Sequence, residues 1–479
     1  LHVDNGDGAS LTGGRTVLDT IVDADGGRGL LLSMFVVRSA HVIIEVPVAV
    51  SENLTLSDSK LDTRGEITGT AHARVMATEW TAAASIALAV LMLEGTSLDM
   101  PEAMNFTRAV LSDGSVCRSS SHDVAIYAEE LTVDGTSRMD GHASTSITIA
   151  AATVTLNGEV DSGVVNIACS LSMTVASSAE VRAGTSARLL GGAISIYGDV
   201  SCASELCAVQ VLSTSDIELE GTSAVVSAGD IRVDSGGDVA IRAGAKLSAS
   251  GRGPASLRGA GAGGACRTSY GGGSGGGHGG EGGYGEGAHS STRGAVYGDI
   301  EEPEHYGSGG GTGCGYRHHA SHVTSGGHGG GRVFVNVSEG TLHIASGARI
   351  SADGGAGTAG STSSPRGYLV SGGGGGSGGS IRILARELAG SGAVTARGGA
   401  GGSKTSAYVS SYWGTVHGRV GGGGGGGRIS VLVGRVLSSD VSLVAYGGLP
   451  GGSSAQRAAA GTIFSAVAGV RSLHVDNGD

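Results

Sequence analysis

Large aromatic side chains are scarce in this sequence. Phe occurs 4 times and Trp 2 times among 479 residues, and all aromatic residues together make up 4%. Because large aromatics usually dominate the core of a globular domain, their scarcity argues against a compact spherical core. A thin core of Val, Ile, Leu and Ala, built strand upon strand, fits this composition better.

Charged residues are also few, at 15%, and no block of basic residues occurs. The net charge of −12 gives no support for nucleic-acid binding. The longest mostly apolar run, at 82–93, has 12 residues, well short of the roughly 20 that a membrane-spanning helix needs. We therefore expect neither a nucleic-acid partner nor a membrane span.

Glycine is present in excess, at 92 of 479 residues, and much of it lies in a repeated cassette. At 372–402 a polyglycine run leads into a β-branched segment, Ile381–Ile383, then a small-residue turn, a second short segment and Gly-Gly-Ala-Gly-Gly. The pattern returns near 326–357 and 421–448, and a degraded copy opens at Gly461. Internal repeats of this kind predict one short-strand unit that is stacked many times.

Residues 124–250 show the clearest periodicity, because short apolar segments come in threes. One such set is 124–127, 131–133 and 138–140. Successive sets begin at residues 124, 147, 164, 188, 208 and 231, a spacing of 17 to 24 residues. Corners such as Asp134-Gly135 supply the left-handed conformation that sharp turns demand. The sequence therefore predicts an all-β fold, a parallel β-helix with three strands and about 22 residues per turn.

The distribution of glycine residues divides the sequence into two parts. Residues 1–250 are predicted to form regular β-helix turns, and residues 251–479 to form turns with glycine-rich insertions. Each insertion follows the third strand of a turn, so we expect all of them to line one side of the solenoid: roughly 251–331, 354–380, 398–427 and 447–461. Their Tyr, Trp and His residues argue against floppy linkers. Packed glycine-rich sheets and polyproline-II-like layers both remain open.

One heptapeptide, Leu-His-Val-Asp-Asn-Gly-Asp, occurs at 1–7 and again at 473–479, an offset of 473 − 1 = 472 residues. We interpret residues 1–472 as one period of a tandem array, with 473–479 starting the next copy. The alternative interpretation is that the second copy of the heptapeptide is an artefact of the sequence. In this interpretation 471–476 forms the second strand of a turn that 462–467 opens, and the solenoid continues through the boundary.

Six cysteines and three N-glycosylation sequons indicate an oxidising, extracellular setting. N-linked glycans are predicted on Asn53, Asn105 and Asn336. Six cysteines allow 15 pairings. Three disulfides are predicted, the last by elimination only: Cys266–Cys314, Cys202–Cys207 and Cys117–Cys169.

Few residues are candidates for metal binding or catalysis. A zinc site is conceivable from soft sulfur and imidazole ligands at Cys314, His318, His319 and His322. Their spacing matches no standard zinc module, so a disulfide beside solvated histidines is preferred. The acidic run 301–304 could bind calcium, although such runs are more often solvated surface. We predict no catalytic residue, no metal site and no cofactor, and hence no enzyme.

The alternation of strands resembles the right-handed parallel β-helix superfamily, which includes pectate lyases, polygalacturonases and many surface adhesins. The resemblance implies a right-handed coil. Enzymes of that superfamily cluster Asp, Arg or Lys on adjacent turns of one face, whereas Asp residues here lie mainly in turns, as at Asp134, Asp140, Asp161 and Asp234. The glycine-rich cassette is similar to large extracellular repeat proteins of protists and bacteria, including components of flagellar hairs and surface fibres.

The sequence therefore predicts a structural protein that self-associates into a long extracellular fibre or surface hair built from tandem solenoid repeats. Two alternatives are a β-helix adhesin that binds glycans or a partner, and a polysaccharide lyase or hydrolase. Carboxylates converging on one face would mark the enzyme. Glycan binding that depends on residues 265–330 would mark the adhesin.

Overall fold

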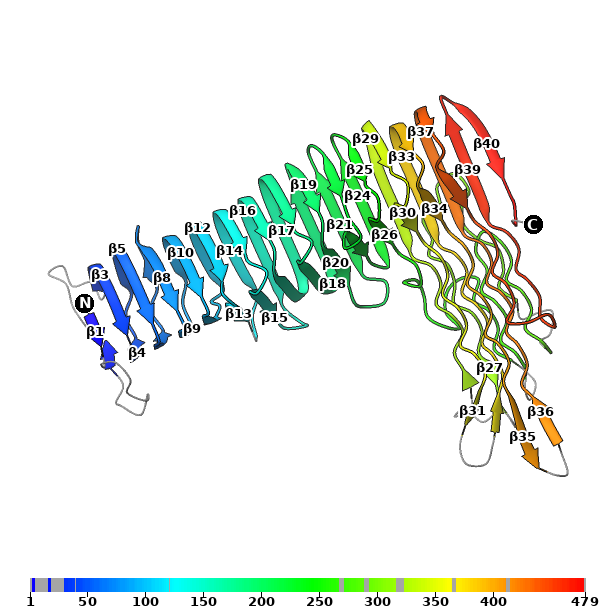
Figure 1. The fold of residues 1–479 in the computed structure, drawn as a ribbon, viewed down its shortest axis with the longest axis horizontal. Coiled ribbons are helices and arrows are strands. Elements are labelled where there is room, and N and C mark those ends of the chain that lie inside the picture. Colours follow the sequence, from blue (N-terminus) through cyan, green and yellow to red (C-terminus); the bar gives the residue numbers. More distant parts are fainter. Residues whose placement is uncertain are drawn as a thin grey trace. The chain divides into compact units, whose positions relative to one another are not determined.

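The computed structural model describes residues 2–4, 16–18, 30–38, 40–119, 121–266, 271–287, 293–315, 323–363, 368–410 and 414–477. Within these residues the fold is all-β, without a helix, and the strands form a parallel β-solenoid (Figure 1). The predicted fold class is confirmed, while the right-handed coil stays a prediction.

The chain divides into two compact units. The first comprises Leu1–Ser201 with Leu212–Thr214, and the second comprises Cys202–Val211 with Ser215–Asp479. This division follows contacts between residues. The predicted boundary at residue 250 has a different meaning, because it separates turns without insertions from turns with them.

The strands of the first unit are β1 (His2–Asp4), β2 (Thr16–Leu18), β3 (Leu30–Arg38), β4 (His41–Ile44), β5 (Val48–Ser57), β6 (Lys60–Thr63), β7 (Ile67–Thr68), β8 (His72–Met76), β9 (Glu79–Ala82), β10 (Ile86–Glu94), β11 (Ser97–Asp99), β12 (Ala103–Ser112), β13 (Val116–Ser119), β14 (Val124–Val133), β15 (Arg138–Gly141), β16 (Ser146–Leu156), β17 (Glu159–Val175), β18 (Glu180–Gly191) and β19 (Ala193–Ile196). Residues of both units occur in β20 (Asp199–Cys202) and β21 (Ala208–Ser213).

The strands of the second unit are β22 (Ile217–Leu219), β23 (Val225–Ser227), β24 (Asp230–Ser235), β25 (Val239–Ile241), β26 (Lys246–Ser248), β27 (Gly313–Cys314), β28 (Val323–Thr324), β29 (Arg332–Ile344), β30 (Arg349–Ser351), β31 (Ser361–Ser363), β32 (Tyr368–Val370), β33 (Ser380–Gly390), β34 (Ala393–Thr395), β35 (Ser406–Ser410), β36 (Gly414–His417), β37 (Arg428–Ser439), β38 (Ser442–Val444), β39 (Thr462–Val467) and β40 (Val470–His474).

The core of the first unit is a set of side-chain columns that run from turn to turn. Ile126 pairs with Ile149, Ile149 with Ile167, and Ile167 with Leu189, so one turn takes 149 − 126 = 23, 167 − 149 = 18 and 189 − 167 = 22 residues. All four side chains are at most 2% exposed. Alternating β-branched residues suit this geometry, because every second side chain of a strand points inward.

The three-segment pattern predicted from residue 124 matches the strand pairing. In this turn the segments 124–128 and 130–133 pair with β16, and 138–140 pairs with the first part of β17. All of these pairs are parallel.

The glycine-rich insertions of the second unit leave the solenoid where the sequence predicted. Each one follows a strand of a single parallel ladder, in which Leu247 of β26, Ile350 of β30, Val394 of β34 and Leu443 of β38 lie in register. Figure 1 shows the insertions running away from this ladder. Three of them contain short antiparallel pairs: β27–β28, β31–β32 and β35–β36.

The two copies of the heptapeptide pair differently. In the first copy β1 lies parallel to β3, with His2 opposite Val36. In the second, β40 folds back on β39 as an antiparallel hairpin, with His474 opposite Ile463. The turn residues Ala468 and Gly469 have φ of 49° and 82°, the left-handed pair that tight hairpins require. The prediction that 471–476 continues the coil in line is therefore wrong for this chain.

Candidate functional site

The insertions pack into a bundle held by backbone hydrogen bonds that repeat every three residues. The N–H groups of Gly373, Gly376 and Gly379 donate to one neighbouring segment, at the carbonyls of Thr358, Gly355 and Ala352. The N–H groups one residue further on, at Gly374 and Ser377, donate to a second segment, at Gly311 and Ser308. Those of Gly372, Gly375 and Gly378 donate to a third, at Arg419, Gly422 and Gly425.

This pattern decides between the two arrangements that the sequence left open. The segment 372–379 donates to three neighbouring segments and accepts hydrogen bonds from three others, at 273–276, 327–330 and 399–402, whereas a β-strand bonds to two neighbours. A three-residue period without internal hydrogen bonds is that of a polyproline-II-like helix. We call this assembly the glycine bundle: its described segments lie within 253–266, 271–287, 293–315, 323–331, 352–363, 368–379, 395–410, 414–427 and 444–461.

Glycine is required in the bundle because the segments lie too close for side chains. A Cβ atom on Gly376 would lie 1.9 Å from the carbonyl oxygen of His328, and one on Gly374 would lie 2.0 Å from that of Ser274. Ser377 is an exception inside the bundle, where its Oγ accepts the N–H of Ser308 at 2.7 Å. The requirement is therefore steric and does not come from unusual backbone angles.

Non-glycine residues mark one outer face of the bundle. The N–H groups of Gly357 and Gly401 donate to the carbonyls of Ala400 and Leu449, which places three segments in one row. Along these segments every third residue has a side chain: Asp353, Ala356 and Ala359; Arg397, Ala400 and Ser403; Tyr446 and Leu449. Ala356, Ala400 and Leu449 are exposed. The three-residue period of the backbone is therefore visible in the sequence of this layer.

An acidic segment at 299–306, which we call the strap, crosses the solenoid strands of the second unit. Ser430 and Ser380 donate through Oγ to the carbonyls of Glu301 and His305, at 2.7 and 2.6 Å. The carboxylates form ion pairs, Glu302 with Arg382 at 2.7 Å and Glu301 with Arg471 at 3.0 Å. The three glutamates keep 44–69% of their side chains exposed, so the run is solvated surface as preferred from the sequence, with exposed ion pairs to arginines added.

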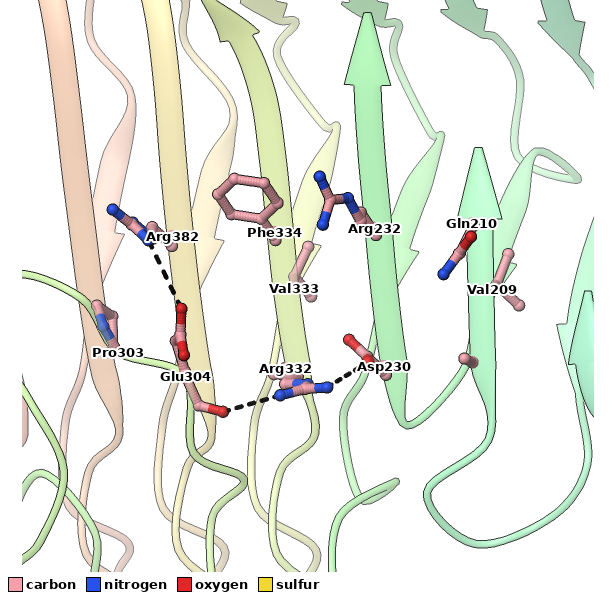
Figure 2. Close-up of a pocket in the computed structure, with 11 residues that line it drawn as sticks. Val209, Gln210, Asp230, Arg232, Pro303, Glu304, Arg332, Val333, Phe334 and Arg382 are labelled. Atoms are coloured by element: carbon pink, nitrogen blue, oxygen red, sulfur yellow. Dashed lines mark hydrogen bonds and ion pairs between the residues drawn. The ribbon is translucent and has the colours of Figure 1, made fainter. Parts of the chain in front are cut away.

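A groove of about 460 Å³ lies beside the strap (Figure 2). Arg232, Phe334 and Arg382 are in register on three adjacent turns. Their guanidinium carbons lie 5.2 Å (Arg232) and 5.8 Å (Arg382) from the centroid of the Phe334 ring. Sequence analysis missed this row, although each member is the middle residue of a β-branched triplet such as Ile231-Arg232-Val233.

The charges of the groove are largely compensated. Arg332 pairs with Asp230 at 2.6 Å and donates to the carbonyl of Glu304 at 3.2 Å, contacts that are drawn in Figure 2. Arg232 pairs with Asp234, and Arg382 pairs with Glu302 of the strap. A groove with paired charges and one aromatic ring suits a neutral, hydroxyl-rich ligand better than a strongly charged one.

A buried histidine in the glycine bundle packs on Tyr297, whose hydroxyl donates to the carbonyl of Tyr306 in the strap at 2.6 Å. His278 is 0% exposed, and its Nδ1 lies 2.9 Å from the carbonyl oxygen of Gly378. Burial is the main cause that lowers the pKa of His278 to about 4, so the ring is neutral at neutral pH and Nδ1 carries the donated proton. Its ring packs on Tyr297 with centroids 4.7 Å apart, and burial raises the pKa of Tyr297 to about 12.

One of the three predicted disulfides is present, Cys266–Cys314. The other four cysteines are free and buried. Cys202 and Cys207 share a side-chain hydrogen bond, which lowers the pKa of Cys207 to about 6 and raises that of Cys202. Cys117 pairs with Met139, and Cys169 with Ala151, in separate ladders, so the pairing inferred by elimination is absent.

The sequons differ in their surroundings. Asn53 and Asn105 are exposed on β5 and β12. Asn336 is half-buried within β29, and its Nδ2 donates to Asp234 at 3.0 Å. Glycosylation of Asn53 and Asn105 stays a prediction, and both side chains are exposed as it requires. The amide of Asn336, in contrast, is already hydrogen-bonded to Asp234.

Of the zinc ligands considered, His318, His319 and His322 lie outside the described residues, and Cys314 is in the disulfide. Over the described ranges no group of three or more His, Cys, Asp and Glu side chains could hold a metal ion. No helix long and apolar enough to cross a membrane occurs in the part of the chain that the structure describes.

Comparison with known proteins identifies no relative of this chain. The likeness to pectate lyases, adhesins and flagellar-hair proteins therefore rests on the sequence pattern alone, while the solenoid itself is observed. No protein-family model, no curated protein and no solved structure matches this chain.

Proposed function

We propose that this protein is a structural component of an extracellular fibre or surface hair, in which solenoids associate end to end. The observation that supports this proposal most is the parallel pairing of successive turns in each unit. A parallel ladder ends on unpaired N–H and C=O groups, and such an edge is a ready template for another chain. The tandem arrangement of 472-residue periods remains part of this proposal.

The glycine bundle would act as a stiff lateral projection. Most backbone hydrogen bonds that join its segments are 2.7–3.0 Å long, as at Gly376 and Gly424. Interior glycines leave no side-chain groups to recognise a substrate, so the chemistry of this region suits mechanical stiffness and spacing. The exposed row with Ala356, Ala400 and Leu449 is the face that would meet neighbouring material.

Negative-stain imaging of the secreted protein tests the proposal. We expect filaments whose number and length rise with protein concentration. Isolated particles at every concentration, in both purified and native material, would contradict a fibre.

A glycan-binding adhesin is the second candidate, favoured by the groove around Phe334. Binding on an array of neutral glycans that is lost in Phe334→Ala and kept in Arg242→Ala, a change at a surface arginine that does not line the groove, would support it. A lyase or hydrolase has less support, because Asp230 and Glu302 are each held by an arginine.

A further inference from the structure

An outward-facing column of apolar side chains crosses adjacent turns of the first unit. We call this column the apolar stripe, and its members lie in register: Tyr127, Ala150, Ala168 and Leu190. Each member directly follows one residue of the buried column that starts at Ile126, so its side chain points to the opposite face of the sheet. Tyr127 is 49% exposed and Leu190 is 37% exposed. Between them small side chains line a shallow depression: Ala128, Ala150, Ala151, Ala168, Cys169 and Ser170.

A glycosylation sequon lies at one end of the apolar stripe. Asn105, which opens the sequence Asn-Phe-Thr at 105–107, pairs with Tyr127 in the neighbouring turn. Met104 and Phe106 on either side of it are buried, so the exposed side chain of Asn105 points outward, as that of Tyr127 does. Residues in register on neighbouring strands are about 4.8 Å apart. A sugar attached to Asn105 therefore begins beside the tyrosine ring.

The other exposed sequon has polar neighbours. The column of Asn53 continues on the following turns through His72, Val90, Arg108 and Glu130. Arg108 and Glu130 form an exposed ion pair at 3.1 Å. A sugar on Asn53 would thus meet an imidazole and charged groups, whereas a sugar on Asn105 would meet a phenol ring and then methyl groups. The two sites differ in what surrounds them, although both side chains are exposed.

We propose that an N-linked glycan on Asn105 lies along the apolar stripe of its own chain, with the first N-acetylglucosamine on the ring of Tyr127 and the next sugars over the alanines. This inference rests on the extracellular setting of the proposed function. Sugars combine apolar C–H faces with hydroxyl-rich edges, so the glycan removes the stripe from water and presents hydroxyl groups in its place. Exposed apolar surface favours association, and the glycan therefore blocks lateral contacts through this face.

The test uses the full chain secreted from insect cells. Glycopeptide mass spectrometry reports which sequons carry sugar, and we expect Asn105 to be occupied. Calorimetry then compares melting temperatures. We expect Asn105→Gln to lower the melting temperature of the first unit by about 2–4 °C, because the stripe loses its cover. Asn53→Gln is the matched control, since it also removes an exposed sequon, and should lower it by less than about 1 °C.

Changes at Tyr127 show whether the ring is the contact. With Tyr127→Ala in place, Asn105→Gln should change the melting temperature by less than about 1 °C, whereas Tyr127→Phe, which keeps the ring, should restore the full effect. Nuclear magnetic resonance of protein with ¹³C-labelled sugars gives an independent readout. The ring should shift C–H resonances of the first sugar to higher field in the wild type and in Tyr127→Phe, but not in Tyr127→Ala.

Three results would overturn the inference: Asn105 without sugar, a sugar on Asn105 that stabilises the chain equally after Tyr127→Ala, and glycosylated protein that dimerises until Leu190→Asp is introduced. The third result would make a second copy of the chain the occupant of the stripe. The fibre proposal is judged separately by imaging. Filaments formed by protein without sugar on Asn105 would refute only the inference, whereas glycosylated protein that never forms filaments would refute only the fibre.

Discussion

The regular turns of the first unit and the glycine bundle of the second are stabilised in opposite ways. In the turns, columns of Ile, Val and Leu fill the interior, as Ile149 does between Ile126 and Ile167. In the bundle the side chains are missing, and backbone groups approach until a Cβ on Gly376 would lie 1.9 Å from a carbonyl oxygen. The comparison shows that one chain can order two regions, one through side-chain packing and the other mainly through backbone hydrogen bonds.

The largest expected effect comes from removing a core side chain. Ile149→Ala should lower the free energy of unfolding of the first unit by about 4 kcal/mol, because buried Ile to Ala changes cost about 2–5 kcal/mol. Hydrogen exchange by mass spectrometry should show faster exchange in turns around β16 and unchanged exchange in the glycine bundle. Equal loss of protection in the bundle would mean that the two regions do not differ as described.

Adding a side chain inside the glycine bundle should destabilise it. Gly376→Ala adds one methyl group where there is no space, and we expect a loss of about 3 kcal/mol, at the upper end for overpacking. The matched control is Ala400→Ser, on the exposed row, which should have almost no effect. If both variants retain wild-type exchange protection in the bundle, close packing is not what requires glycine there.

Acid should weaken the bundle before the turns. The pKa of His278 is lowered to about 4 from an ordinary 6.5, so the folded state favours the neutral ring. The stability it contributes is present above pH 6.5 and is lost as the pH falls towards 4. The shift of 6.5 − 4 = 2.5 pH units corresponds to about 3 kcal/mol. His278→Gln should remove most of this dependence, measured as bundle exchange between pH 4 and 7. An identical acid dependence in the variant would assign the effect to other groups.

The smallest effect is expected at the strap. The side chains of Arg382 and Glu302 are 18% and 66% exposed, so their ion pair should contribute about 0.5–1 kcal/mol. A double-mutant cycle with Arg382→Gln and Glu302→Gln measures this coupling by thermal denaturation, and 0.5 M salt should reduce it. A coupling above 3 kcal/mol would mean that the strap is a main support of the second unit.

The sequence predicted the solenoid because its signal lies in side-chain alternation, as in Ile147–Ala150 and Val154–Leu156. It also predicted where the insertions leave, since each follows the same corner. The packing of the bundle stayed open between glycine-rich sheets and polyproline-II-like layers, because glycine carries no pattern of inward and outward faces. Only in the outer row, with Ala356 and Ala400, does a side chain at every third residue show the period of the backbone in the sequence.

Other parts of the site depend on pairs of residues far apart in the chain. Arg382 and Glu302 are separated by 80 residues, and nothing local in either segment indicates the contact. The end of the chain was predicted wrongly because the tight turn at Ala468-Gly469 favours a local hairpin over the in-line strand. The free thiols of Cys117 and Cys169 show the weakness of pairing cysteines by elimination.

X-ray diffraction from oriented, concentrated protein tests the central claim most directly. Strands stacked along a fibre that grows through its solenoid ends should give a sharp meridional reflection at about 4.8 Å. A 4.8 Å reflection on the equator, or no orientation at any concentration, would contradict end-to-end growth.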